Sequence, residues 1–233
     1  MPMAFQLIIE KGTIMALVID SVIRRTMVFL AGSALASAIL ITNAGQLCAQ
    51  DASEEDLEKA LRPSPELIET LRKAQKLGQQ EKFGELAKLM AEEVKKNPED
   101  KPTLFAAAQF VQQVAFQFLE DEKLRDKANP FFYDVSKYMR KLNKLHDGKL
   151  PGQLNEMYST AIYNEACCLS LEGKKDKAIK VLEESVKAGF SEYDVIKDDA
   201  DFNPLREDPK FKKAFEALVE KVKKNVPKPR IRT

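Results

Sequence analysis

The sequence contains no tryptophan, one histidine and only nine glycines among 233 residues. One histidine does not supply the ligand sets of the common zinc sites, and no glycine-rich phosphate loop occurs. Alternating runs of Val, Ile and Thr are scarce, so β-strands have little support. No Ser/His/Asp arrangement has a supporting motif. These shortages remove the signatures of the common hydrolytic, nucleotide-dependent and zinc-dependent enzymes. We therefore predict that the chain is not an enzyme and binds no cofactor.

The charge balance shows no excess of one sign. The formal net charge is +1, and the first 49 residues account for it with three basic and two acidic side chains. The neutral remainder gives no electrostatic reason to expect a nucleic-acid partner. The one local exception is the basic end of the chain, where residues 226–233 are predicted to be a solvated tail.

The N-terminal residues 1–49 have the features of an export signal. Residues 26–42 (TMVFLAGSALASAILIT) are uncharged and largely apolar, Arg24 and Arg25 precede them, and Ala49 stands before a polar stretch. A basic region, an apolar core and a small residue before a polar start form the signal-peptide pattern. We predict export to the periplasm or out of the cell, with cleavage after Ala49.

Residues 26–42 also leave alternatives open. Their 17 uncharged residues are near the lower limit for spanning a bilayer, so the segment can instead remain as an inner-membrane anchor. Cys48 is a candidate for lipidation, although no leucine stands three positions before it, as a lipobox requires. The region before the apolar core is long for a signal peptide, and Met15 is an alternative start.

The body of the chain has only two cysteines, Cys167 and Cys168. Adjacent residues on a helix point about 100° apart, which is a poor geometry for a mutual disulfide. Their spacing also differs from the CxxC motif of redox and zinc proteins. We expect both to be buried as small apolar side chains, so the fold must depend on its hydrophobic core.

Good helix formers dominate after a short acidic and polar leader at 50–63. Prolines next to capping residues indicate helix starts at Ser64-Pro65, Asn129-Pro130 and Asp208-Pro209, and more loosely at Pro102. Apolar residues then recur at three- and four-residue steps. The domain 64–225 is predicted to contain helices at 65–77, 81–96, 102–121, 130–145, 153–171, 175–188 and 209–224, with an irregular segment at 191–205.

The predicted helix 102–121 is unusual because it contains no charge between Thr103 and Leu119. A helix that is apolar nearly all round is expected in the centre of a domain. Its polar side chains are glutamines at steps of three and four: Gln109, Gln112, Gln113 and Gln117. Glutamine offers both a donor and an acceptor without the desolvation cost of a charge.

The stretch 162–190 (IYNEACCLSLEGKKDKAIKVLEESVKAGF) resembles a tetratricopeptide repeat. The family's aromatic–Asn pair, inter-helix glycine, small residue and large apolar residue correspond to Tyr163-Asn164, Gly173, Ala178 and Leu182. Gly189-Phe190 stand where the family has a terminating proline. Residues 199–211 resemble the end-of-group module that closes some bacterial arrays of this repeat.

This resemblance implies an all-α, right-handed stack of about three antiparallel helical hairpins with a C-terminal capping helix. One such hairpin cannot bury its apolar face alone, whereas three stacked hairpins can. In the family, the first helix of each hairpin lines a concave groove. We therefore expect the four glutamines to contact an extended peptide; hydrogen bonding to neighbouring helices is the alternative.

Two further features have structural interpretations. His146 stands beside Asp147-Gly148 in a predicted loop and is expected to be a surface residue. Asp198, Asp199 and Asp201 lack the glycine and later glutamate of a calcium loop, so we expect them to cap helices and form turns.

The function predicted from these observations is that of an exported adaptor or scaffold that binds a protein or peptide in a helical groove. The alternative is a membrane-anchored structural component of an envelope complex or homo-oligomer, held by residues 26–42.

Overall fold

The computed structural model describes residues 60–120 and 124–225. Every regular element in these two ranges is helical, so the prediction of an all-α protein is confirmed. The signal or anchor segment 1–49, most of the leader 50–63 and the tail 226–233 lie outside the described residues. Among the helices that are described, none is both long enough and apolar enough to cross a bilayer.

All seven predicted helices are present, with bounds within two residues of the expected ones. They are α3 (Pro65–Gln79), α4 (Phe83–Lys96), α5 (Lys101–Glu120), α6 (Asn129–Leu145), α7 (Gly152–Leu171), α8 (Lys175–Lys187) and α11 (Pro209–Asn225). A short 3₁₀ helix, η1 (Arg125–Lys127), precedes α6.

The segment 191–205 was predicted to be irregular, and this was wrong. It contains α9 (Tyr193–Asp198), η2 (Ala200–Phe202) and the start of α10 (Asn203–Arg206). Each element is at most six residues long, which is too short for the apolar period of a helix to be recognised.

Three of the proline-marked helix starts are capped as predicted. The Ser64 hydroxyl accepts a hydrogen bond from the Leu67 amide at 3.1 Å. Asp100 accepts from the Thr103 amide at 2.9 Å, and Asp208 accepts from the Lys210 amide at 3.0 Å. Asn129 is different, because it lies inside α6 and its amide group donates at 3.1 Å to Glu172, the residue that follows α7.

Helices α7 and α8 end in the same way, with a glycine in the left-handed region. Gly173 has φ +72° and Gly189 has φ +107°. After α8, the Phe190 amide donates to the Ser185 carbonyl at 3.0 Å and the Gly189 amide donates to the Val186 carbonyl at 3.1 Å. This is the Schellman arrangement, which satisfies carbonyls that the helix leaves open.

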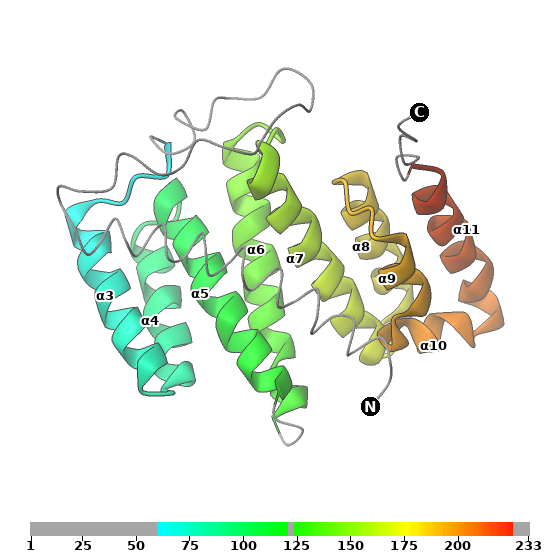
Figure 1. Ribbon diagram of the computed structural model, residues 1–233, viewed down its shortest axis with the longest axis horizontal. Coiled ribbons are helices and arrows are strands. Elements are labelled where there is room, and N and C mark those ends of the chain that lie inside the picture. The colour runs from blue at the N-terminus through cyan, green and yellow to red at the C-terminus, as the bar shows by residue number, and fades with distance from the viewer. Residues whose placement is uncertain (1–59, 121–123, 226–233) are drawn as a thin grey trace, which may run out of the picture. The chain divides into compact units, whose positions relative to one another are not determined.

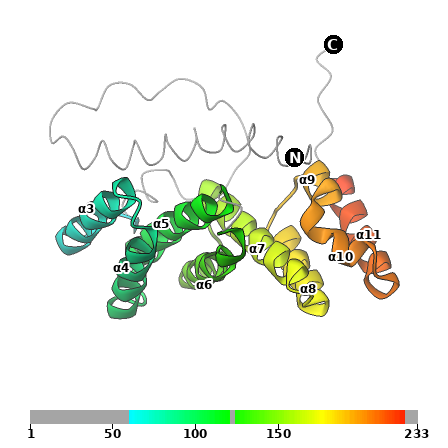
Figure 2. The same cartoon turned by 90° about the horizontal axis from the view of Figure 1, so that it is seen from below.

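From α3 to α8, consecutive helices pack side by side and run in opposite directions (Figure 1). The segments 64–97 and 153–189 therefore each form an antiparallel pair, α3 with α4 and α7 with α8. Figure 2 shows α3, α5 and α7 along one side of these helices and α4, α6 and α8 along the other. We call α3, α5 and α7 the first helices and α4, α6 and α8 the second helices.

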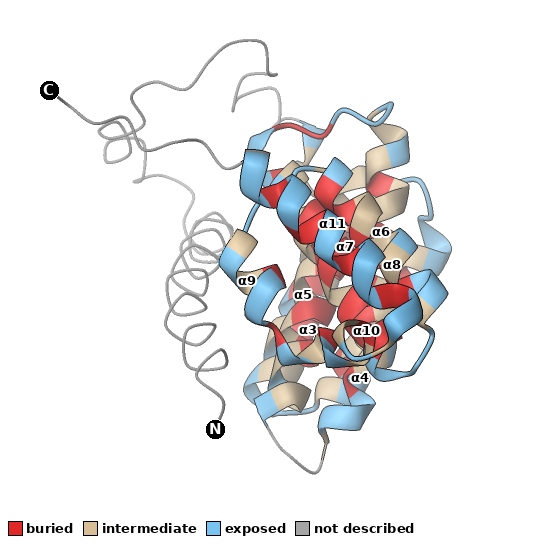
Figure 3. Ribbon diagram, turned by 90° about the vertical axis from the view of Figure 1, so that its right-hand side faces the viewer, coloured by how far each residue is buried: buried red, intermediate tan, exposed pale blue. Residues whose placement is uncertain are grey.

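Two large apolar clusters meet on α7. One contains Leu71, Met90, Val111, Leu142 and Ile162, and so joins α3 to α7. The other joins α7 to α8, η2 and α11 through residues such as Tyr163, Leu182, Phe202 and Phe215. Buried residues accordingly lie where the helices face one another (Figure 3). Helix α7, which carries eleven buried residues against nine on α5, is the most enclosed of the long helices.

Candidate interaction face

All four predicted glutamines lie on α5, but their environments differ. Gln109 and Gln113 are half-buried and Gln117 is exposed, whereas Gln112 is only 7% exposed. The Gln117 amide donates to Glu120 at 3.5 Å. Within residues 60–120 and 124–225, the side chains of Gln109, Gln112 and Gln113 form no hydrogen bond. The alternative of hydrogen bonding to neighbouring helices is therefore not seen for these three.

The side chain of Gln112 is the unusual one. Buried amide groups in proteins are nearly always hydrogen-bonded, because an unpaired one has lost its water without a replacement. The amide atoms of Gln112 are not among the fully enclosed unpartnered atoms, so the amide of this nearly buried residue keeps some contact with solvent but has no protein partner in the described residues.

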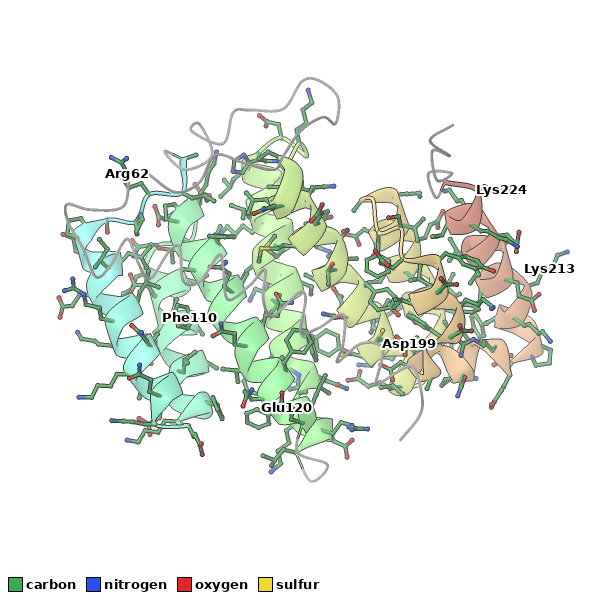
Figure 4. All side chains as sticks on the ribbon, in the orientation of Figure 1. Arg62, Phe110, Glu120, Asp199, Lys213 and Lys224 are labelled. Atoms are coloured by element: carbon green, nitrogen blue, oxygen red, sulfur yellow. The ribbon has the colours of Figure 1, made fainter. Side chains whose placement is uncertain are left out.

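Aromatic rings flank the glutamines along α5. Phe105, Phe110 and Phe116 are each half-buried, and Phe116 packs edge-on against Phe132 of α6 with ring centroids 5.6 Å apart. Figure 4 labels Phe110, near the middle of α5, and Glu120, at its C-terminal end. The open side of α5 therefore combines amides with apolar rings.

Helix α7 contributes a second unpartnered amide, Asn164. Its Nδ2 atom is buried and has no hydrogen-bond partner in the part of the chain that the structure describes. Ala115 of α5 and Cys168 of α7 belong to one apolar cluster, and the two helices run in the same direction. Gln112 and Asn164 lie one turn before these two residues on their helices, so both amides are near this cluster.

Asn164 belongs to a row of α7 side chains that the second helices do not cover. The side chains of Gln153, Met157, Thr160, Asn164 and Leu171 recur at helical spacing on α7 and are half-buried or exposed. Leu171, at 55%, is the exposed large apolar side chain of the described residues. We define the α5/α7 face as this row together with its counterpart on α5: Phe105, Gln109, Gln112, Gln113 and Phe116.

Charged residues concentrate elsewhere, and several of them are paired. Arg140 of α6 bonds to Glu165 of α7 at 2.5 Å and to Glu184 of α8 at 2.9 Å. Glu184 also accepts from the Tyr158 hydroxyl at 2.9 Å. These contacts tie α6, α7 and α8 together. Because every group in this network has a partner, it is a structural feature and not an open site.

The same network borders a pocket of about 460 Å³ on α6, α7 and α8, with Asn143, Lys180 and Lys187 among its lining residues. Lys187 already pairs with Glu183 at 3.2 Å. The pocket is open to solvent and its buried polar groups are satisfied, so it has less reason to hold a ligand than the α5/α7 face.

The predicted aspartate cluster divides in the structure. Asp198 is exposed beside Lys197, whereas Asp199 is buried and accepts from the Asp201 amide at 2.9 Å, which caps η2 as expected. Asp199 also accepts from the Tyr163 hydroxyl at 2.5 Å (Figure 4 labels Asp199). Burial, and next the Asp199 carboxylate, raise the pKa of Asp201 to about 6.

Cys167 lies beside these carboxylates, with a ligand atom of each within 4.8 Å of the others. Three donors are fewer than the four of a structural zinc site, and Asp199 is already used by Tyr163. Cys167 and Cys168 are both free and buried, as predicted, and burial raises the pKa of each thiol. We therefore interpret the cluster of Cys167, Asp199 and Asp201 as a structural contact that holds η2 against α7.

His146 differs from its prediction. It follows α6 directly and is half-buried, and its Nε2 atom is enclosed without a partner among the described residues. Burial, and next the charge of Lys101, lower the pKa of His146. Among the described residues, His146 belongs to no cluster of metal-ligating side chains.

No family model, curated protein or solved structure matches this chain. The case for a functional site therefore comes from the residues and their geometry. Of the features above, the α5/α7 face alone combines two unpartnered amides with accessible apolar side chains. Sequence reasoning indicated its α5 half and missed its α7 half, although Asn164 was part of the Tyr163-Asn164 pair that signalled the repeat.

Proposed function

We propose that this protein is a tetratricopeptide-like binding module, an exported adaptor that holds an extended segment of another protein against its α5/α7 face. The observation that carries the proposal is Gln112, a side chain with 7% exposure whose amide has no partner in the described residues. A fully enclosed amide without a partner costs about 1–3 kcal/mol. The Gln112 amide keeps some contact with water, so its cost is at the lower end of this range, and a bound ligand would remove it.

The order of the helices supports this proposal. The pairs α3–α4, α5–α6 and α7–α8 would be the three hairpins of a right-handed stack, and α11 would be its capping helix. Apolar side chains of α11 pack on α8 and η2 while Lys212, Lys213 and Glu216 on its other side are exposed. A terminal helix with a polar outer face is what a stack of repeats needs for solubility.

The chemistry of the face supports it as well. A primary amide can donate to a carbonyl and accept from an N–H group, which are the two groups that an extended backbone presents at every residue. Rings and aliphatic side chains beside the amides can cover the apolar side chains of the same segment. Peptide recognition in proteins commonly combines these two kinds of contact.

A structural role as a membrane-anchored component of an envelope complex is the alternative prediction. It depends on residues 26–42, which lie outside the described residues, and no feature of the described helices favours it. Export itself also remains a proposal that rests on the sequence of the first 49 residues.

The test is capture of partners by the full chain with matched variants. Immobilised wild-type protein and three variants, Gln112→Leu, Gln113→Ala and Lys137→Ala, are incubated with the exported protein fraction of the source cells. Lys137 is exposed on α6 and serves as the control. We expect captured proteins to be retained by Lys137→Ala and reduced at least fivefold by the two glutamine variants. Equal capture by all four proteins would contradict a binding role for this face.

A further inference from the structure

The α5/α7 face has no charged side chain, although 31% of the chain is charged. Helix α5 carries no charge from Pro102 to Leu119. On α7 the open row from Gln153 to Leu171 is uncharged too, because Glu156 and Glu165 lie to either side of it. Exposed positions on the second helices are different, because they include charged residues such as Lys88 on α4, Lys137 on α6 and Lys180 on α8.

This absence of charge limits what the face can bind. A charged side chain that leaves water for such a surface loses its hydration and meets no counterion there, which costs several kcal/mol. A neutral segment avoids this cost, since its backbone can pair with the Gln112 amide and donate to the Asn164 Oδ1 atom, while its side chains cover Phe105, Phe116 and Met157.

We propose that the segment bound by the α5/α7 face is an extended stretch of a partner protein that is uncharged and largely apolar, recognised chiefly through its backbone. This inference rests on the proposed function and specifies its partner chemistry. The amides of Gln112 on α5 and Asn164 on α7 place the backbone of the segment on the α5/α7 face.

The size of the face sets the length of the uncharged stretch. Residues 105–116 rise about 17 Å along the axis of α5, at about 1.5 Å for each residue. An extended segment advances about 3.3 Å for each residue, so about five consecutive residues cover this distance. Charges outside these five positions are not desolvated by the face and are tolerated.

The experiment is selection from a random dodecapeptide display library on the immobilised full chain, followed by affinity measurement with the synthetic peptide that is most enriched. We expect enriched peptides to share a run of about five residues without Asp, Glu, Lys or Arg. In that peptide, changing the central residue to Glu or Lys should weaken binding at least tenfold. Raising the salt concentration from about 0.1 M to 1 M should change the affinity less than about threefold, because no ion pair is involved.

Two other outcomes separate this inference from the proposed function. If enriched peptides carry charges in the central run and lose affinity in high salt, yet still bind more weakly to Gln112→Leu, the face binds peptides and the inference about charge is wrong. If no enriched peptide depends on Gln112, both the inference and the proposed function are wrong. Lys137→Ala is the control variant and should bind every enriched peptide as the wild type does.

Discussion

Replacing Gln112 with leucine should make the protein more stable. The two side chains have similar volumes, so leucine can fill the space in α5 without a cavity or a clash. The substitution removes an amide that has no partner and adds apolar surface at a position that is 7% exposed. A fully unpaired buried amide costs about 1–3 kcal/mol, but the amide of Gln112 keeps some contact with water. We therefore expect a gain of about 1 kcal/mol, at the lower end of that range.

Urea denaturation of the full chain, followed by far-UV circular dichroism, measures this gain. For a domain of this size 1 kcal/mol corresponds to roughly 2–4 °C in Tm. The control is Ser185→Ala, which removes a satisfied buried group, since the Ser185 hydroxyl donates to the Ser159 carbonyl at 2.7 Å. The control should lose about 1 kcal/mol. A loss of that size in Gln112→Leu would mean that the amide is used inside the fold, and the interpretation of α5 as a binding helix would be refuted.

Three further predictions concern the rest of the fold. Burial and the Asp199 carboxylate raise the pKa of Asp201 to about 6, so its protonation stabilises the fold at low pH and that contribution is lost as the pH rises through about 6. The Tm of Asp201→Asn relative to wild type should hence increase between about pH 4 and pH 7, and a constant difference would contradict this. Gly189→Ala, at φ +107°, should cost about 1–2 kcal/mol, while Gly84→Ala, in open space on α4, should gain about 0.5 kcal/mol in the same urea assay. Arg140→Ala leaves two carboxylates unpaired and should cost about 1–2 kcal/mol; no loss in thermal denaturation would show that these ion pairs contribute nothing.

The helices were predictable because their signals are local. Apolar residues at three- and four-residue steps define each long helix, and the capping groups of Ser64, Asp100 and Asp208 stand within three residues of the amides they bind. Such signals depend only on neighbours in the sequence. The same holds for the glycine ends of α7 and α8, where a positive φ favours glycine over other residues.

The errors occurred where distant residues decide the outcome. Asn129 was expected to cap a helix, but its side chain binds Glu172, which is 43 residues away. The first helix was predicted to end at residue 77, but α3 continues to Gln79, and Glu81 then takes the left-handed conformation with φ +56°. Gly78 remains helical, and a Cβ atom there would lie 3.4 Å from Leu86, so its small size serves packing against α4.

The candidate site was predictable only in part for the same reason. The spacing of the four glutamines placed them on one helix, but nothing in the sequence distinguishes Gln112 from Gln113. Only the packing of α5 within the fold buries Gln112 and leaves Gln113 half-exposed. Asn164 was noticed for its place in a motif, and its unpartnered amide became evident only when α7 was seen among its neighbours.

The central claim is that the α5/α7 face is where the partner binds, and site-specific photocrosslinking tests it most directly. A photoreactive phenylalanine analogue replaces Gln113 on α5 in one protein and Lys137 on α6 in another, and each is irradiated with the enriched display peptide. We predict a covalent adduct from position 113 and none from position 137. Adducts from position 137 alone would place binding on the second helices and contradict the account.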